Sequence, residues 1–179
     1  MKQRQIVLGV TGSIAAYKAC DIVRRLQDQS CDVTVIMTDS AEKFVTRMTF
    51  EALSRKPVYG DMFARDVEWD MAHISLAKLA DVFLVAPATA NIIGKFANGL
   101  ADDLLSCSLI TTKAPVLLAP AMNSAMFANA IVQENIARLK QHGVNFVGPK
   151  SGKLACGDVG CGALADVDDI VKAVMALLK

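Results

Sequence analysis

The sequence contains few of the residues that build disulfide frameworks, metal centres or aromatic-rich surfaces. Among its 179 residues are five cysteines, two histidines and one tryptophan, and aromatic residues make up 6%. An odd number of cysteines without a CxxC pair does not fit a secreted disulfide framework, and no metal-ligand spacing is present. The formal net charge is only +1, which argues against nucleic-acid partners because these need a strongly basic surface.

Long apolar runs are also missing. The longest, 82–88 and 114–122, are far shorter than the roughly 20 residues that span a bilayer. The N-terminal apolar stretch is interrupted at 11–13 and again at 17–18, which argues against a signal peptide. We therefore expect a soluble, cytoplasmic protein without a membrane partner. Because 53% of the residues are hydrophobic, the chain has more apolar surface than one core hides, and this favours a homo-oligomer.

Apolar runs of strand length alternate with helical patterns along the whole chain. The runs lie at 6–10, 33–37, 82–86 and 115–119, with a weaker fifth at 144–147. Helical patterns include an apolar stripe from Ala15 to Leu26, a segment from Ser124 to His142 that Gly143 ends, and a last helix capped by Asp166. This order predicts one α/β domain over 1–179, with a central parallel sheet flanked by helices.

The strand ends carry the candidate binding residues, because ligands of such sheets bind beyond the carboxyl ends of the strands. The Gly12-Ser13 turn leads into a helix and suits a phosphate, and a tight turn without a ligand is the alternative. Thr89 or Asn91 is expected to cap the helix after the third strand, and Asn123 follows the fourth strand, where it either caps a helix or orients a ligand. The charged residues of 95–103 are interpreted as a solvated face.

Two further residues are candidates for chemistry. His73 is expected in the first turn of a helix capped by Asp70, where the helix dipole keeps the imidazole neutral, and a purely structural role is the alternative. Cys156 lies in a glycine-rich segment at about 149–164 that has no periodicity. Such a segment is typical of a flap over a site, and a flap can deliver Cys156 to a bound substrate.

Four motifs in order resemble the flavin-dependent cysteine decarboxylases: GSIAAYK at 12–18, HI at 73–74, PAMNSAM at 120–126 and ACGD at 155–158. The segment 86–105 resembles the flavin-contacting stretch of that family. The likeness is to those members that convert 4'-phosphopantothenoylcysteine to 4'-phosphopantetheine in coenzyme A biosynthesis. It implies a Rossmann- or flavodoxin-like three-layer fold, a carboxy-lyase, and a homo-oligomer (trimer or dodecamer) that holds FMN between subunits.

The resemblance also implies roles for individual residues. The implied FMN contacts are Gly12, Ser13, Ile14, Thr38, Ala88, Thr89, Asn91 and Ala121. The implied substrate contacts are Met122, Asn123, Ala155 and Cys156. His73 would assist as a base, Asn123 would orient the leaving carboxylate, and Cys156 would return a proton. In the implied reaction FMN oxidises the substrate thiol to a thioaldehyde, CO₂ leaves to give an enethiolate, and the electrons return to the product.

Other readings are a peptide C-terminal cysteine decarboxylase, a flavin prenyltransferase, or a non-catalytic flavin-binding regulatory subunit. Cys156 argues against the first, because an enethiol product needs no proton donor. Ala163 stands where the family usually has arginine, which leaves the substrate contacts of the flap open. Bacterial relatives often continue into a phosphopantothenoylcysteine synthetase domain, so a fused or separate synthetase is an expected partner.

Overall fold

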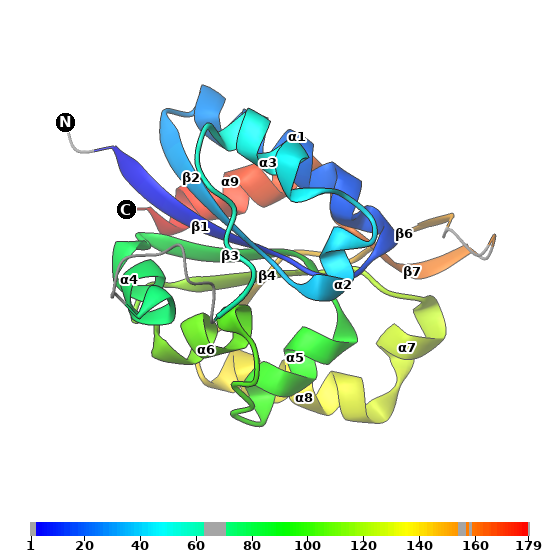
Figure 1. Ribbon diagram of the computed structural model, residues 1–179. Coiled ribbons are helices and arrows are strands. Elements are labelled where there is room, and N and C mark those ends of the chain that lie inside the picture. The colour runs from blue at the N-terminus through cyan, green and yellow to red at the C-terminus, as the bar shows by residue number, and fades with distance from the viewer. Residues whose placement is uncertain (1–2, 63–70, 154–156, 158, 179) are drawn as a thin grey trace.

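The computed structural model describes residues 3–62, 71–153, 157 and 159–178. Helices cover both faces of a central sheet, which gives three layers (Figure 1). The elements in chain order are β1 (Arg4–Val10), η1 (Ile14–Tyr17), α1 (Lys18–Asp28), β2 (Cys31–Met37), α2 (Asp39–Glu42), α3 (Arg47–Ser54), α4 (Ala72–Leu79), β3 (Val82–Ala88), α5 (Ala90–Ala97), α6 (Leu104–Thr111), β4 (Val116–Pro120), α7 (Ser124–Ala128), α8 (Ala130–Gln141), β5 (Asn145–Phe146), β6 (Lys150–Lys153), β7 (Val159–Ala163) and α9 (Val167–Leu177).

The central sheet has the strand order β2-β1-β3-β4-β5, and every neighbouring pair is parallel. The residues of β3 and β4 are all buried, as expected for strands with helices on both faces. All five predicted strands are confirmed, and so is the predicted fold class. Because the strands are parallel, their carboxyl ends meet at one edge, where β1, β2 and β3 are followed by η1, α2 and α5.

Two hydrophobic cores lie on opposite faces of the sheet. Residues of α1, α3 and α9 pack on one face, and residues of α4, α5, α6 and α8 pack on the other (Figure 1). Gly9 of β1 allows one of these helices to approach closely, because a Cβ there would lie 2.5 Å from Leu105 Cδ1 of α6. Among the described residues, no helix has both the length and the apolar character needed to cross a membrane.

Three predicted elements differ in the structure. The stripe from Ala15 to Leu26 is divided between the 3₁₀ turn η1 and α1. The helix predicted from Ser124 to His142 is two helices, because Asn129 adopts an extended backbone and its Oδ1 accepts a hydrogen bond from Ile131 N at 3.0 Å. The described part of the glycine-rich segment is an antiparallel ribbon of β6 and β7.

Two predicted helix ends near the C-terminal half of the chain are confirmed. Asp166 is the N-cap residue of α9, although its side chain makes no capping hydrogen bond. His142 is the C-cap residue of α8, and Gly143 follows it with a φ of +83°, a left-handed conformation that glycine adopts without steric cost.

Candidate functional site

A cavity of about 560 Å³ opens at the carboxyl ends of β1, β2 and β3. This volume lies in the range of small-molecule and cofactor sites, roughly 300–1,000 Å³. Its lining residues come from the ends of these strands and the segments after them, from α5, from the start of α6, and from single positions before α4 and in α7: Thr11, Gly12, Met37, Thr38, Asp39, Ser40, Gly60, Thr89, Ala90, Asn91, Ile92, Lys95, Asp102, Asp103, Leu104, Leu105 and Met126. The position is the one that a parallel sheet predicts for a ligand.

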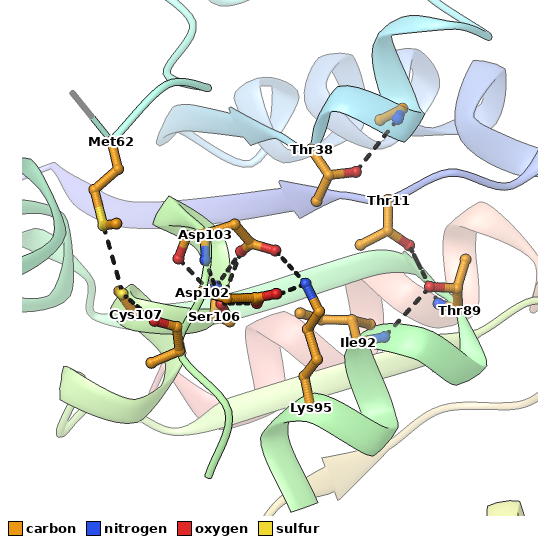
Figure 2. A network of polar contacts seen from close by, with 12 residues as sticks. Thr11, Thr38, Met62, Thr89, Ile92, Lys95, Asp102, Asp103, Ser106 and Cys107 are labelled. Carbon is orange, nitrogen blue, oxygen red and sulfur yellow. Dashed lines mark hydrogen bonds and ion pairs between the residues drawn. The ribbon is translucent and has the colours of Figure 1, made fainter. Parts of the chain in front are cut away.

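One side of the cavity, which we call the hydroxyl wall, is formed by Thr11, Thr38 and Thr89 (Figure 2). Thr11 is 2% exposed, and its hydroxyl donates to the carbonyl oxygen of Pro87 at 2.7 Å and accepts from Thr89 N at 3.2 Å. One side chain therefore joins the end of β1 to the end of β3. Because both backbone partners depend on this hydroxyl, its loss would leave buried polar groups unpaired.

The other two threonines of the hydroxyl wall begin helices. Thr38 Oγ1 accepts from Ala41 N at the start of α2, and Thr89 Oγ1 accepts from Ile92 N at the start of α5. The predicted cap at Thr89 is thus confirmed. These caps fix the first turns of two helices beside the cavity.

The opposite side, the charged wall, is formed by Lys95, Asp102 and Asp103 (Figure 2). Lys95 Nζ lies 2.7 Å from Asp102 Oδ1 and 2.7 Å from Asp103 Oδ2, and the Lys95 side chain is only 17% exposed. The interpretation of 95–103 as a solvated face was therefore wrong for Lys95. Its long side chain folds back over the connection between α5 and α6 rather than extending into solvent.

The charged wall is anchored to α6. Asp103 Oδ1 accepts from both Ser106 N at 2.8 Å and Ser106 Oγ at 2.9 Å, and Ser106 Oγ accepts from Asp103 N in return. This is a capping box. Burial alone would raise the pKa of Asp103, but the hydrogen bonds from Lys95 and Ser106 lower the pKa below its ordinary value. Burial likewise opposes the charge of Lys95, and its bonds to the two carboxylates raise the pKa of Lys95.

The predicted cofactor contacts are only partly brought together. Gly12, Thr38, Thr89 and Asn91 line the cavity, whereas Ser13, Ile14, Ala88 and Ala121 are chain neighbours or strand-end residues that do not line it. Ser13 caps η1, and its Oγ accepts from Ala15 N at 3.3 Å. Ile14 is 57% exposed, whereas Ala88 and Ala121 are buried. The cofactor-contact role of all eight residues stays a prediction.

The predicted substrate residues Met122 and Asn123 lie against the β6–β7 ribbon. Met122 N donates to the carbonyl oxygen of Gly162 at 2.9 Å, and a Cβ on Gly162 would lie 2.2 Å from Met122 O. Asn123 is the N-cap residue of α7, because its Oδ1 accepts from Ala125 N at 2.8 Å. The glycine-rich segment therefore does meet the strand end that carries Asn123. Ala155 and Cys156 lie outside the described residues.

His73 is not brought to these groups within one chain. It is the second residue of α4, which confirms its place in a first helical turn, and the N-cap residue is Met71 rather than the predicted Asp70. Asp70 itself lies outside the described residues. Helix α4 lies near the opposite end of the sheet from α7 and the β6–β7 ribbon (Figure 1).

Sequence reasoning missed four cavity residues that carry polar interactions: Thr11, Lys95, Asp102 and Asp103. Thr11 carried a usable signal, since it stands directly after a buried strand and before Gly12. The charged residues carried no such signal beyond their spacing. In a sequence, a lysine and two aspartates that line a cavity cannot be told from an exposed helical lysine and exposed loop aspartates.

Comparison with known proteins places this geometry in a family. The chain is 48% identical over 172 residues to the coenzyme A biosynthesis bifunctional protein CoaBC of Bacillus subtilis, which covers 96% of the chain and 42% of that protein. It is 44% identical over 173 residues to the probable phosphopantothenoylcysteine decarboxylase of Streptococcus mutans, covering 96% of the chain and 97% of that protein. The chain thus spans about two fifths of the bifunctional relatives.

Solved structures agree with the sequence matches. A cysteine-to-serine mutant of PPC decarboxylase complexed with pantothenoylaminoethenethiol superposes with a TM-score of 0.86 at 28% identity, covering 98% of each chain. The FMN-dependent cysteine decarboxylase SpaF gives a TM-score of 0.86 at 28% identity over 99% of this chain and 98% of that one. The sequence profile of the family described as Flavoprotein matches residues 1–179. The chain therefore belongs to the flavoprotein family.

Proposed function

We propose that the chain is an FMN-dependent decarboxylase that converts 4'-phosphopantothenoylcysteine to 4'-phosphopantetheine in coenzyme A biosynthesis. The observation that carries this proposal is the match to the Streptococcus mutans decarboxylase along 97% of that protein. The strand-end cavity supports it, because it provides a site for the cofactor that a decarboxylase of this kind needs. Relatives that act in coenzyme A biosynthesis support the substrate.

The cavity fits FMN in size and in its donor groups. Its volume of about 560 Å³ is sufficient for a cofactor of this class. Hydroxyl groups of Thr38, Ser40 and Thr89 and the amide of Asn91 face it, and neutral donors of this kind suit both ring heteroatoms and phosphate oxygens. Gly12 also lines the cavity and packs closely against the start of α2, because a Cβ there would lie 2.4 Å from Ser40 Cβ. These residues would hold the cofactor.

Besides the cofactor, two residues of the chain have proposed roles in the reaction. When bound, FMN supplies a reversible two-electron oxidation of the substrate thiol, which turns the adjacent carboxylate into a leaving group. Asn123 would orient that carboxylate: Ala125 N holds its Oδ1, which fixes the plane of the amide and hence the direction of its NH₂ group. His73, in the first turn of α4, would act as the base.

Cys156 would donate the proton that accompanies the return of two electrons from the cofactor, and both are needed to convert the enethiolate into the saturated thiol. The PPC decarboxylase with a cysteine replaced by serine is complexed with an enethiol, and an enethiol is the species that accumulates when decarboxylation proceeds without this last protonation. The position of Cys156 in the glycine-rich segment agrees with this role, because the described part of that segment packs against the strand end that carries Asn123.

The separation of His73 from Asn123 supports a homo-oligomeric enzyme. Within one chain, α4 and α7 lie near opposite ends of the sheet (Figure 1), so a common site for both residues needs a second copy of the chain. A trimer, or a dodecamer built from trimers, would provide it. A synthetase, fused or separate, is the proposed partner because bifunctional relatives contain further sequence, and the cytoplasm is the proposed location.

The function is tested by an absorption spectrum and a product assay on the purified protein. We expect bound FMN whose visible bands bleach on adding the thiol substrate, together with release of CO₂. The Cys156→Ser variant should still release CO₂ but accumulate the enethiol, whereas Cys20→Ser should turn over normally, since Cys20 lies in α1 away from the cavity. Flavin-loaded protein that releases no CO₂ from 4'-phosphopantothenoylcysteine would refute the proposed function.

A further inference from the structure

Lys95 lines the cavity, and its ammonium is paired with two carboxylates. Its ammonium contacts Asp102 and Asp103, each at 2.7 Å, and Asp103 is fixed in turn by its capping box with Ser106, which is 1% exposed. A backbone hydrogen bond also holds the connection after α5 in place, since Leu100 N donates to the carbonyl oxygen of Lys95 at 2.9 Å. The ammonium is therefore positioned before any ligand arrives.

The bonding of this ammonium is incomplete. A lysine side chain has three N–H donors, and two of them serve the carboxylates. In the part of the chain that the structure describes, the third has no hydrogen-bond partner. Because Lys95 lines the cavity (Figure 2), this donor is available to a ligand bound there.

The charges around the cavity indicate which kind of acceptor this donor suits. The charged lining residues are one cation, Lys95, and three carboxylates, those of Asp39, Asp102 and Asp103, which gives a formal charge of −2. This sum already includes the positive charge of Lys95. A dianion such as a phosphate at Lys95 would add negative charge beside the carboxylates of Asp102 and Asp103, whereas an uncharged oxygen or nitrogen acceptor would not.

We propose that Lys95 is a flavin-binding residue that donates its third N–H to an uncharged acceptor of the flavin ring system, with Asp102 and Asp103 as its positioning residues. The inference rests on the proposed flavin site, and it adds to that site a charged donor, the Lys95 ammonium, that contacts the ring. It concerns the ring and not the phosphate, so it applies equally to FMN and to riboflavin, which has the same ring and no phosphate.

The test is a fluorescence titration of the apoprotein with FMN and, separately, with riboflavin. Lys95→Met should weaken both ligands by a similar factor, roughly 10- to 100-fold, because a hydrogen bond from a charged donor is lost. The matched control is Lys172→Met on the exposed surface of α9, which should leave both affinities unchanged. The visible absorption bands of Lys95→Met saturated with FMN should also shift from those of the wild-type protein.

A second variant separates the ring contact from the ion pairs. In Lys95→Met/Asp102→Asn, only one carboxylate is left without its cation, so the repulsion between Asp102 and Asp103 is removed. Asp102 is the partner chosen because it is the more exposed of the two, at 67%. If the flavin affinity stays as low as in Lys95→Met, the missing contact is the cause. Recovery of wild-type affinity would overturn the proposal, because the ion pairs alone would then explain the loss.

The other outcomes are equally decisive. A loss of affinity for FMN but not for riboflavin would place Lys95 at the phosphate and overturn the proposal, and so would unchanged affinity for both. Wild-type protein that binds neither flavin would also overturn it. Wild-type protein that binds flavin without releasing CO₂ would refute the decarboxylase function but leave the Lys95 contact intact.

Discussion

The hydroxyl wall and the charged wall face the same cavity but are built in different ways. In the hydroxyl wall, short side chains bond to backbone groups at the strand ends, and Thr11 is almost fully buried. In the charged wall, one long side chain reaches the end of a loop, and its partners are 67% and 32% exposed. Removing a partner from a buried network leaves polar groups without a hydrogen bond that water could replace, which costs stability. Half-exposed ion pairs, in contrast, contribute little to stability. We therefore expect the hydroxyl wall to matter for folding and the charged wall for the ligand.

The largest effect is expected from closing the space beside the hydroxyl wall with Gly12→Ala. The new Cβ would lie 2.4 Å from Ser40 Cβ and 3.1 Å from its backbone carbonyl carbon, so the start of α2 would have to move. We expect the free energy of unfolding to fall by about 3 kcal/mol and the FMN affinity to fall with it, measured by urea denaturation and fluorescence titration.

The control for this change is a glycine of α5 that does not line the cavity. Gly94→Ala in α5 would meet only Asn135 Nδ2 at 3.8 Å, an ordinary contact, and alanine should stabilise the helix by about 0.5–1 kcal/mol. Equal stability of Gly12→Ala and the wild type would show that α2 is not packed as tightly as its distances indicate.

The second effect isolates the hydroxyl of Thr11. Thr11→Val keeps the shape but leaves Pro87 O and Thr89 N unpaired, so the free energy of unfolding should fall by about 1–2 kcal/mol. Thr11→Ser keeps the hydroxyl and should lose only about 0.8 kcal/mol for the missing methyl group. Both are measured by urea denaturation of the apoprotein. A serine variant no more stable than the valine variant would exclude the hydrogen bonds as the cause.

The contrast between the walls also explains what the sequence could predict. The strands and the cap at Thr89 follow from local patterns, because buried strands and helix starts are determined by nearby residues. The break at Asn129 was missed, since an asparagine within an apolar helical pattern becomes a helix end only when its side chain binds its own backbone.

The charged wall was missed for a different reason. Whether Lys95 extends into water or folds back onto Asp102 and Asp103 depends on the path of the connection between α5 and α6, which no local pattern specifies. The separation of His73 from Asn123 is likewise a property of the whole chain, because it follows from α4 preceding β3 and α7 following β4 in a parallel sheet.

The smallest effect expected is the pH dependence contributed by Asp103. The folded chain lowers the pKa of this carboxyl below its ordinary value of 3.8, so the ionised group stabilises the fold at pH values above that. The contribution is lost as the pH falls through the lowered pKa, because the carboxyl must then be protonated in both states. Since the side chain is about one third exposed, the contribution should be below about 1 kcal/mol.

Urea denaturation between pH 6 and pH 2.5 measures this contribution. The wild type should lose more stability than Asp103→Asn over this interval, so that the difference between the two proteins narrows with falling pH. Asp28→Asn, at the exposed end of α1, should run parallel to the wild type throughout. A constant difference in the free energy of unfolding between wild type and Asp103→Asn would mean that the variant is destabilised by its altered capping box with Ser106. The lost charge would then not be the cause. The charged wall would then stabilise the fold by geometry alone, as the hydroxyl wall does.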